Sequence, residues 1–337
     1  MFSAIRKHLG LSQPSMAERL EVSVDLVKGW ETGRRPLTRV SAEDLWRHEH
    51  VILAAGAPAE LVSVLSEAIR ADVILANVPG ADDAHVLGPH PLAAIVPGRT
   101  LTELLAWPIS GVPPRVLRGL VNGERAQLPA GDRKDLAHAL AITAESADGN
   151  TEQGAMLRRQ AAYLAASEPT MAGWTPPMPR RPVAVADSWL PEWPVQRSRA
   201  IAAASAGDVD ALHQFVDTSL VSEQAKSANL TYWAYWCGEI PHVWRSDAQM
   251  VTTPVESWPG DKLLSTLLDG LVHAPYRDLC AHTLNTLLER KPHLVHAHRE
   301  RLAETLTHSL DANHDGALAP SARDALQQTH YLVRSLR

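Results

Sequence analysis

The segment DANHDGAL, residues 311–318, begins with the residue types of a calcium-binding loop. Asp311, Asn313 and Asp315 alternate with other residues, and Gly316 follows at the place of the sharp turn. Such a loop closes on a bidentate glutamate at its twelfth position, where this sequence has Ala322. Because the ligand that completes the site is missing, we predict a polar turn between helices and no calcium site.

Histidine and cysteine side chains near the C-terminus contain the donor atoms that zinc prefers. They are His282, His293, His296, His298 and Cys280. The last three histidines are spaced by three and then two residues, so they do not align on one helix face. The sequence also has no glycine-rich phosphate loop and no nucleophile elbow. We therefore expect no metal, no cofactor and no catalytic site.

Basic residues recur in two short segments that can be aligned on each other. LVKGWETGRR, residues 26–35, matches VLRGLVNGER, residues 116–125, after a shift of 90 positions. Between residues 2–35 and 92–125 there are seven identities, whereas chance in a chain rich in alanine and leucine gives roughly two or three. The sequence therefore predicts that one short module occurs twice.

The first copy has the pattern of three short helices. Ser12 and Ser23 each precede an apolar helical stripe and are natural N-caps. Gly33 ends the third helix at the position that favours positive φ. Two short helices, a tight turn and a third helix form a helix-turn-helix.

The segments GLSQ, MAERLEVS and LVKGWETGRRP resemble the Xre-type family of phage-repressor-like DNA-binding domains over about 50 residues. The resemblance implies that the third helix enters the major groove of double-stranded DNA and begins at Ser23. It also implies that the protein regulates transcription, as a homodimer on paired half-sites. The residues it nominates for DNA contact are Val24, Asp25 and Lys28 for base edges, Gln13, Arg34 and Arg35 near phosphates, and Ser23 at the start of the third helix.

Two positions of the third helix have more than one interpretation. Gly29 stands where the family often has a polar base-reading residue, and it either lets the helix approach DNA closely or permits tight packing within the protein. Asp25 either accepts a hydrogen bond from a cytosine amino group or favours the helix dipole at the N-terminus.

The second copy, LTELLAWPISGVPPRVLRGLVNGER, resembles the same family but departs from it. Trp107 replaces the small Ala17 and should push two helices apart, and Pro108 should break the second helix early. Glu103 occupies the place of Gln13 and would repel phosphate. The copy is either a second DNA contact or a degenerate module kept for packing or dimerisation. Its possible DNA contacts are Arg115, Arg118 and Arg125.

Strand signals are scarce, and we predict an all-α chain. Seven prolines and three tryptophans in residues 169–196 indicate a linker held against a domain surface. Later helices are predicted at residues 197–206, 208–217, 222–237, 260–273, 276–291, 293–310 and 319–335. The predicted domains are 1–50, the first helix-turn-helix; 51–88, a helical connector; 89–145, the second module; 146–168, a helix; 169–196, the linker; and 197–337, a helical bundle or short helical-repeat domain.

The C-terminal segments ANLTYWAYWCGEIP and WLPEWPVQRSRAIAAASAGDVDALHQFVD resemble the C-terminal part of large Xre-type regulators, which implies a domain that responds to a small molecule or a protein partner. Tyr232, Trp233, Tyr235 and Trp236 cannot all face one side of a helix. Some therefore meet another helix of the core, a partner or a ligand.

Composition limits the remaining possibilities. The net charge of −6 means that any binding to nucleic acid must come from local basic faces. Two cysteines exclude a disulfide framework, and no apolar run is long enough to span a membrane. We expect a cytoplasmic transcriptional regulator that binds DNA as a homodimer. The alternative is an assembly protein whose helix-turn-helix modules bind protein.

Overall fold

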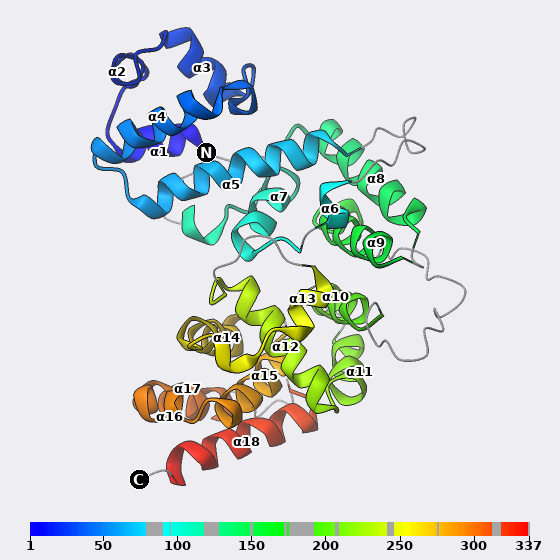
Figure 1. The fold of residues 1–337 in the computed structure, drawn as a ribbon. Helices are drawn as coiled ribbons and strands as arrows, with labels where there is room; N and C mark the ends of the chain where they lie inside the picture. The colour runs from blue at the N-terminus through cyan, green and yellow to red at the C-terminus, as the bar shows by residue number, and fades with distance from the viewer. Residues whose placement is uncertain are drawn as a thin grey trace. The chain divides into compact units, whose positions relative to one another are not determined.

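The structure, a computed structural model, describes residues 1–78, 90–94, 96–117, 128–148, 151–171, 174, 192–205, 209–240, 246–274, 276–311 and 318–335. All regular elements in these ranges are helices, so the protein is all-α, as predicted (Figure 1). None of the described helices is long and apolar enough to cross a membrane.

Contacts divide the chain into two compact units. Unit 1 comprises residues 1–91, 100–142 and 167–170, and unit 2 comprises residues 92–99, 143–166 and 171–337. Residues 89–145, predicted to form the second module, are therefore shared between the two units. The helices found mainly in unit 1 are α1 (Phe2–His8), α2 (Gln13–Arg19), α3 (Val24–Thr32), α4 (Ala42–Ala54), α5 (Ala59–Ala76), α7 (Arg99–Ser110) and α8 (Ala130–Ser146).

Local signals explain how α2 and α3 begin and end. The Ser12 hydroxyl accepts a hydrogen bond from the Ser15 amide, and the Ser23 hydroxyl accepts one from the Leu26 amide. Gly33 ends α3 with a φ of 75°, in the left-handed region. These three predicted helix boundaries are confirmed.

The core of unit 1 forms where the apolar faces of these helices meet. Ile5 of α1, Met16 of α2 and Val27 of α3 are buried together with Trp30. The Trp30 ring lies edge-on to Phe2 at a centroid distance of 5.1 Å. Helices as short as α1 and α2 are marginal alone, so this packing stabilises them.

The prediction that Pro108 breaks its helix early is wrong. α7 continues through Pro108 to Ser110. The proline is near the helix end, where its missing N–H removes one backbone hydrogen bond. Burial of Leu105, Trp107 and Ile109 in the same stretch favours the helix and offsets that loss.

Unit 2 is built around α15, whose side chains are buried on nearly every side. Leu279, Cys280, Leu284 and Leu287 have no exposed surface, and α14 and α18 contact this helix (Figure 1). The helices found mainly in unit 2 are α9 (Glu152–Ala165), α10 (Glu192–Ser205), α11 (Asp210–Ser219), α12 (Glu223–Trp236), α13 (Asp247–Thr252), α14 (Asp261–His273), α15 (Arg277–Arg290), α16 (His293–Ala297), α17 (Arg299–Asp311) and α18 (Pro320–Ser335). The short helix α6 (Pro91–Ala94) lies at the boundary between units.

The helices of unit 2 agree with the predicted ones except at four places. α9 covers Glu152–Ala165, where a helix over 146–168 was predicted. α10 begins at Glu192, inside the predicted linker, because Pro194 falls in its first turn, where a missing N–H is tolerated. The predicted helix 293–310 is interrupted at His298, and α13 was not predicted. Trp193 is buried and donates to the Ser219 carbonyl at 2.9 Å, so this tryptophan is held in the core, whereas residues 175–191 lie outside the described ranges.

Candidate nucleic-acid interface

α3 has one buried face and one exposed face. Val27, Gly29 and Trp30 are buried against the rest of unit 1. Asp25 and Lys28, three residues apart, are exposed. The exposed side of this helix therefore presents two of the three side chains nominated for base contact.

The other nominated residues lie around this face. Val24 is half-buried in the first turn of α3, and Ser23 is used as the N-cap of the helix. Arg34 and Arg35 are exposed directly after the helix end. Gln13 is half-buried at the start of α2.

Asp25 forms ion pairs with both arginines that follow α3. Its carboxylate accepts from the Arg34 guanidinium at 2.5 Å and lies 3.4 Å from that of Arg35. The hydrogen bond from Arg34, with the charge of that residue, lowers the pKa of Asp25. The two arginines that the family resemblance assigns to phosphates, Arg34 and Arg35, therefore both pair with the Asp25 carboxylate in this structure.

Gly29 is explained by packing inside the protein. A Cβ added at this position would lie 3.0 Å from Cβ and 3.1 Å from Cγ of Arg35. The Arg35 amide also donates to the Gly29 carbonyl at 3.0 Å. The glycine lets the Arg35 backbone and stem cross α3 closely, and this contact places the guanidinium beside the exposed face.

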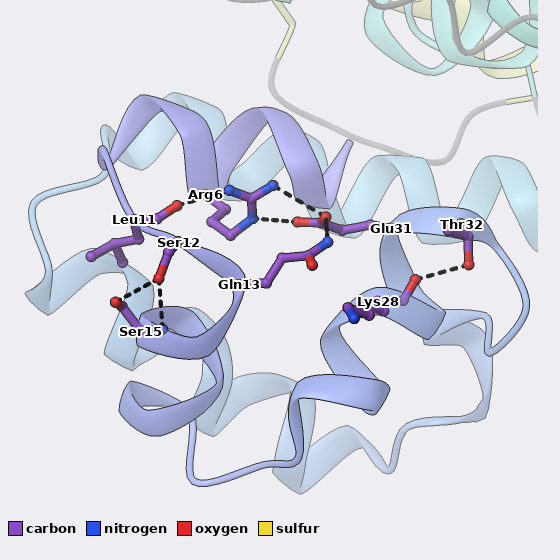
Figure 2. A network of polar contacts seen from close by, with 8 residues as sticks. All are labelled: Arg6, Leu11, Ser12, Gln13, Ser15, Lys28, Glu31 and Thr32. Carbon is purple, nitrogen blue, oxygen red and sulfur yellow. Dashed lines mark hydrogen bonds and ion pairs between the residues drawn. The ribbon is translucent and has the colours of Figure 1, made fainter.

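A polar network inside unit 1 joins the three short helices (Figure 2). Arg6 donates to the Glu31 carboxylate at 2.5 and 3.2 Å and to the Leu11 carbonyl at 2.8 Å. The Gln13 amide donates to the same carboxylate at 2.7 Å. Burial alone would raise the pKa of Glu31, but hydrogen bonds from Arg6 and Gln13 outweigh it and the pKa lies below its usual value.

This network fixes α1, α2 and α3 relative to each other, and it holds the Gln13 side-chain nitrogen inward. Because the Gln13 side-chain nitrogen donates to Glu31, it is not free to donate to a phosphate in this structure. Sequence reasoning did not find Arg6 or Glu31. They are 25 residues apart, and only the folded chain brings them together.

The second module shares one feature with the first. Glu21 and Gly111, which align with each other, both have positive φ, 57° and 73°, in the turn after the second helix. In the described residues of the second copy, however, only a single 3₁₀ turn (Arg115–Leu117) stands where α3 would begin. Arg118, Gly119, Gly123 and Arg125 lie outside the described ranges.

Glu103 of the second module does not present a free negative charge. Its carboxylate accepts from the Arg115 amide at 2.7 Å and lies 3.5 Å from the Arg115 guanidinium. The expectation that Glu103 simply repels phosphate is therefore incomplete, because it also holds Arg115.

The residues considered for metal binding do not come together where the structure describes them. No group of three or more histidine, cysteine or acidic side chains in the described ranges is arranged to hold an ion. His298 pairs instead with Asp261 at 2.8 Å, and burial raises the pKa of Cys280 to about 12. The central residues of the calcium-like segment, 312–317, lie outside the described ranges.

Comparison of the chain with protein-family models, with curated proteins and with solved structures found no match. Function is therefore argued from the geometry of unit 1 and from the sequence resemblance.

Proposed function

We propose that this protein binds specific sequences in double-stranded DNA through the exposed face of α3 and regulates transcription. The observation that carries the proposal is a capped helix with Lys28 on its exposed face and Arg34 and Arg35 directly after its end. B-DNA has a major groove about 12 Å wide, which admits one helix. The Arg6–Glu31 network supplies the rigid support that a reading helix needs.

Each exposed residue has a role that its chemistry permits. Lys28 donates to guanine acceptors, and the Val24 methyl groups contact a thymine methyl. Arg34 and Arg35 neutralise phosphates at the edge of the groove. A single helix of this kind covers only a few base pairs, so we propose that two chains bind a palindrome with half-sites about one helical turn apart.

The test is selection of bound duplexes from a random library by the full chain, followed by titration of single-base variants. Lys28→Ala should weaken binding to the selected sequence by about 5- to 150-fold and relax preference at one base position. Lys134→Ala is the matched control, because Lys134 is an exposed lysine of α8 in the same unit. If neither variant alters binding, or if no sequence is enriched, α3 is not a DNA-reading helix.

A second candidate function is protein binding by unit 1. α4 exposes Trp46 at 69% and Leu53 at 41%, and these residues are seven positions apart on one side of the helix. An exposed tryptophan of this kind is typical of protein interfaces. This candidate is favoured if Trp46→Ala abolishes an association that persists at high salt while Lys28→Ala changes nothing, since DNA binding falls steeply with salt.

A further inference from the structure

Two arginines of unit 2, Arg159 and Arg197, differ in their partners: the first pairs with a buried carboxylate and the second with a neutral amide. Arg159 donates to both oxygens of Asp247, at 2.9 and 3.0 Å, and the Tyr232 hydroxyl donates to the same carboxylate. Arg159 and Asp247 are both buried. This bidentate pair is closed, and its two charges cancel.

The other arginine, Arg197 of α10, has only neutral partners among the residues that the structure describes. Its Nε donates to the Asn229 side-chain oxygen at 2.9 Å. The Asn229 nitrogen in turn donates to the Thr283 hydroxyl at 2.8 Å, so the amide is held in one orientation. No described carboxylate forms an ion pair with Arg197, and neither terminal nitrogen has a hydrogen bond to a described residue.

Aromatic rings stack on the Arg197 guanidinium. Its central carbon lies 5.2 Å from the centre of the Trp233 ring and 5.8 Å from that of Tyr232. Burial lowers the pKa of Arg197 to about 10, which still leaves it charged at neutral pH. Cation–π contacts stabilise the guanidinium by less than the cost of taking an unpaired charge out of water.

Further aromatic rings pack around Trp233 next to Arg197. The Trp233 ring lies 5.6 Å from that of Trp236 and 5.7 Å from that of Tyr276. Trp236 and Tyr276 are half-buried, as is Arg197, so the cluster reaches the surface. Trp233 is 3% exposed, and its indole N–H has no hydrogen-bond acceptor among the residues that the structure describes. The cluster thus combines an unneutralised cation, an unused donor and apolar rings.

We propose that unit 2 binds a small aromatic monocarboxylate at Arg197, with its carboxylate on the guanidinium and its ring against the half-buried Trp236 and Tyr276, which pack on the buried Trp233. The two terminal nitrogens of arginine form a planar fork that matches the two oxygens of a carboxylate. A second cation, Arg99, lies 4.6 Å from the centre of the Trp236 ring and has interactions of its own. A monoanion therefore matches the single charge of Arg197, and inorganic phosphate tests whether a dianion binds better. The aromatic side chains favour a planar apolar body, because contacts between rings stabilise binding beyond the burial of apolar area.

The acid site of unit 2 is independent of the proposed DNA binding by α3; only a regulatory effect of the acid on that binding would rest on the proposed function. If DNA is not bound but the acid is, the proposed function fails and this site remains. If DNA is bound but the acid is not, this site fails and the proposed function remains.

The test is calorimetric titration of the full chain with benzoate and phenylacetate, and with benzamide and phenylacetamide as uncharged partners of the same shape. Acetate and inorganic phosphate test the need for the ring and for a single charge. We expect the aromatic acids to bind with a Kd of about 0.1–1 mM and about 10- to 100-fold more tightly than the amides. The fluorescence of the clustered tryptophans should change at the same ligand concentrations.

Arg197→Met should remove the difference between acid and amide. Arg301→Met is the matched control, because Arg301 is an exposed arginine of the same unit that contacts Ser265 and Asp269. If Arg197→Met does not fold, Arg197→Lys replaces it: the charge remains without the fork, and the acids should bind at least about tenfold more weakly.

Three results would overturn the proposal. The first is absence of binding by either acid at about 10 mM, since even a fragment of this size should bind a built site at that concentration. The second is equal affinity for acid and amide. The third is equal affinity for benzoate, acetate and phosphate, which would show a general anion contact without an aromatic site.

Discussion

If α3 reads DNA as proposed, the ion pairs of Asp25 should limit binding of the protein to DNA of non-specific sequence. Arg34 and Arg35 are held by the Asp25 carboxylate at 2.5 and 3.4 Å in the free protein. To contact phosphates they must exchange this carboxylate for DNA, and the carboxylate then lies close to the phosphates. We therefore expect Asp25→Asn to strengthen binding to DNA of any sequence.

The size of the effect follows from the charges on this face. Lys28, Arg34 and Arg35 contribute three positive charges and Asp25 one negative charge, so the net charge is +2, and Asp25→Asn raises it to +3. Each additional neutralised phosphate steepens the dependence of log affinity on log salt by about 0.9. A fourfold increase in salt, from about 50 to about 200 mM, should thus weaken the variant about 3.5-fold more than the natural protein.

Fluorescence anisotropy with a random-sequence duplex and a selected duplex, each at two salt concentrations, measures both quantities. Glu223→Gln is the matched control: Glu223 is also an exposed acid paired with two cations, Lys226 and Arg290, but it belongs to unit 2. Unchanged affinity and salt slope on random DNA for Asp25→Asn would refute the reasoning. A loss confined to sites with one particular cytosine would show instead that Asp25 reads that base.

Three further predictions concern unit 1 and its second module. Glu31→Ala should destabilise unit 1 by about 2–4 kcal/mol in urea denaturation, because it leaves Arg6 largely buried without a counter-charge. The control Asp44→Ala removes an exposed ion pair and should lower the stability by less than about 1 kcal/mol. Equal losses of stability in the two variants would contradict the role of the Arg6–Glu31 network. Burial lowers the pKa of His48, so the unfolded chain binds a proton at this residue more readily than the folded chain. The contribution of His48 to the stability of unit 1 should therefore be complete above about pH 6.5 and be lost as the pH falls below that value. His48→Leu should reduce the difference in free energy of unfolding between about pH 7 and pH 5, and an unchanged pH profile would contradict this role of His48. Replacing the three arginines of the second module by alanine should lower DNA affinity and flatten its salt dependence without altering the preferred sequence, whereas loss of preference at a separate block of bases would show that this module reads sequence. Those arginines are Arg115, Arg118 and Arg125.

Sequence alone was sufficient for the features that depend on neighbouring residues. The hydroxyls of Ser12 and Ser23 accept hydrogen bonds from backbone amides three residues further along and so cap their helices. Gly33 ends α3 because its backbone adopts a left-handed conformation. Several helices of unit 2 begin and end within one residue of the predicted bounds, including α14 and α15. Periodicity and capping are local, and so they can be read without knowledge of the fold.

Local rules failed where packing opposed them. Pro108 was expected to break its helix, yet buried neighbours keep α7 helical to Ser110. Gly29 had two interpretations from sequence, and only the position of Arg35 in space favours packing. In both cases the deciding contact comes from side chains whose burial depends on the whole unit.

The nominated DNA-contacting residues show the same division. Sequence resemblance selected Lys28, Arg34 and Arg35, and their exposure agrees with a surface role that stays a prediction until DNA binding is measured. That Asp25 holds both arginines could not be predicted, because an ion pair forms only when the chain turns back after Gly33 and brings the groups within 4 Å.

The sequence by itself determined the all-α class, the caps at Ser12 and Ser23 and the bounds of helices such as α14 and α15, since each follows from hydrogen bonds and apolar spacing within a few residues. Only the tertiary structure decided which charges meet. Arg6 finds Glu31 across 25 residues, and Arg159 finds Asp247 across 88. Arg197, by contrast, donates to the neutral amide of Asn229, 32 residues away. Such pairings depend on the relative placement of whole helices. Burial of the apolar helix faces sets that placement, so no local pattern in the sequence encodes it.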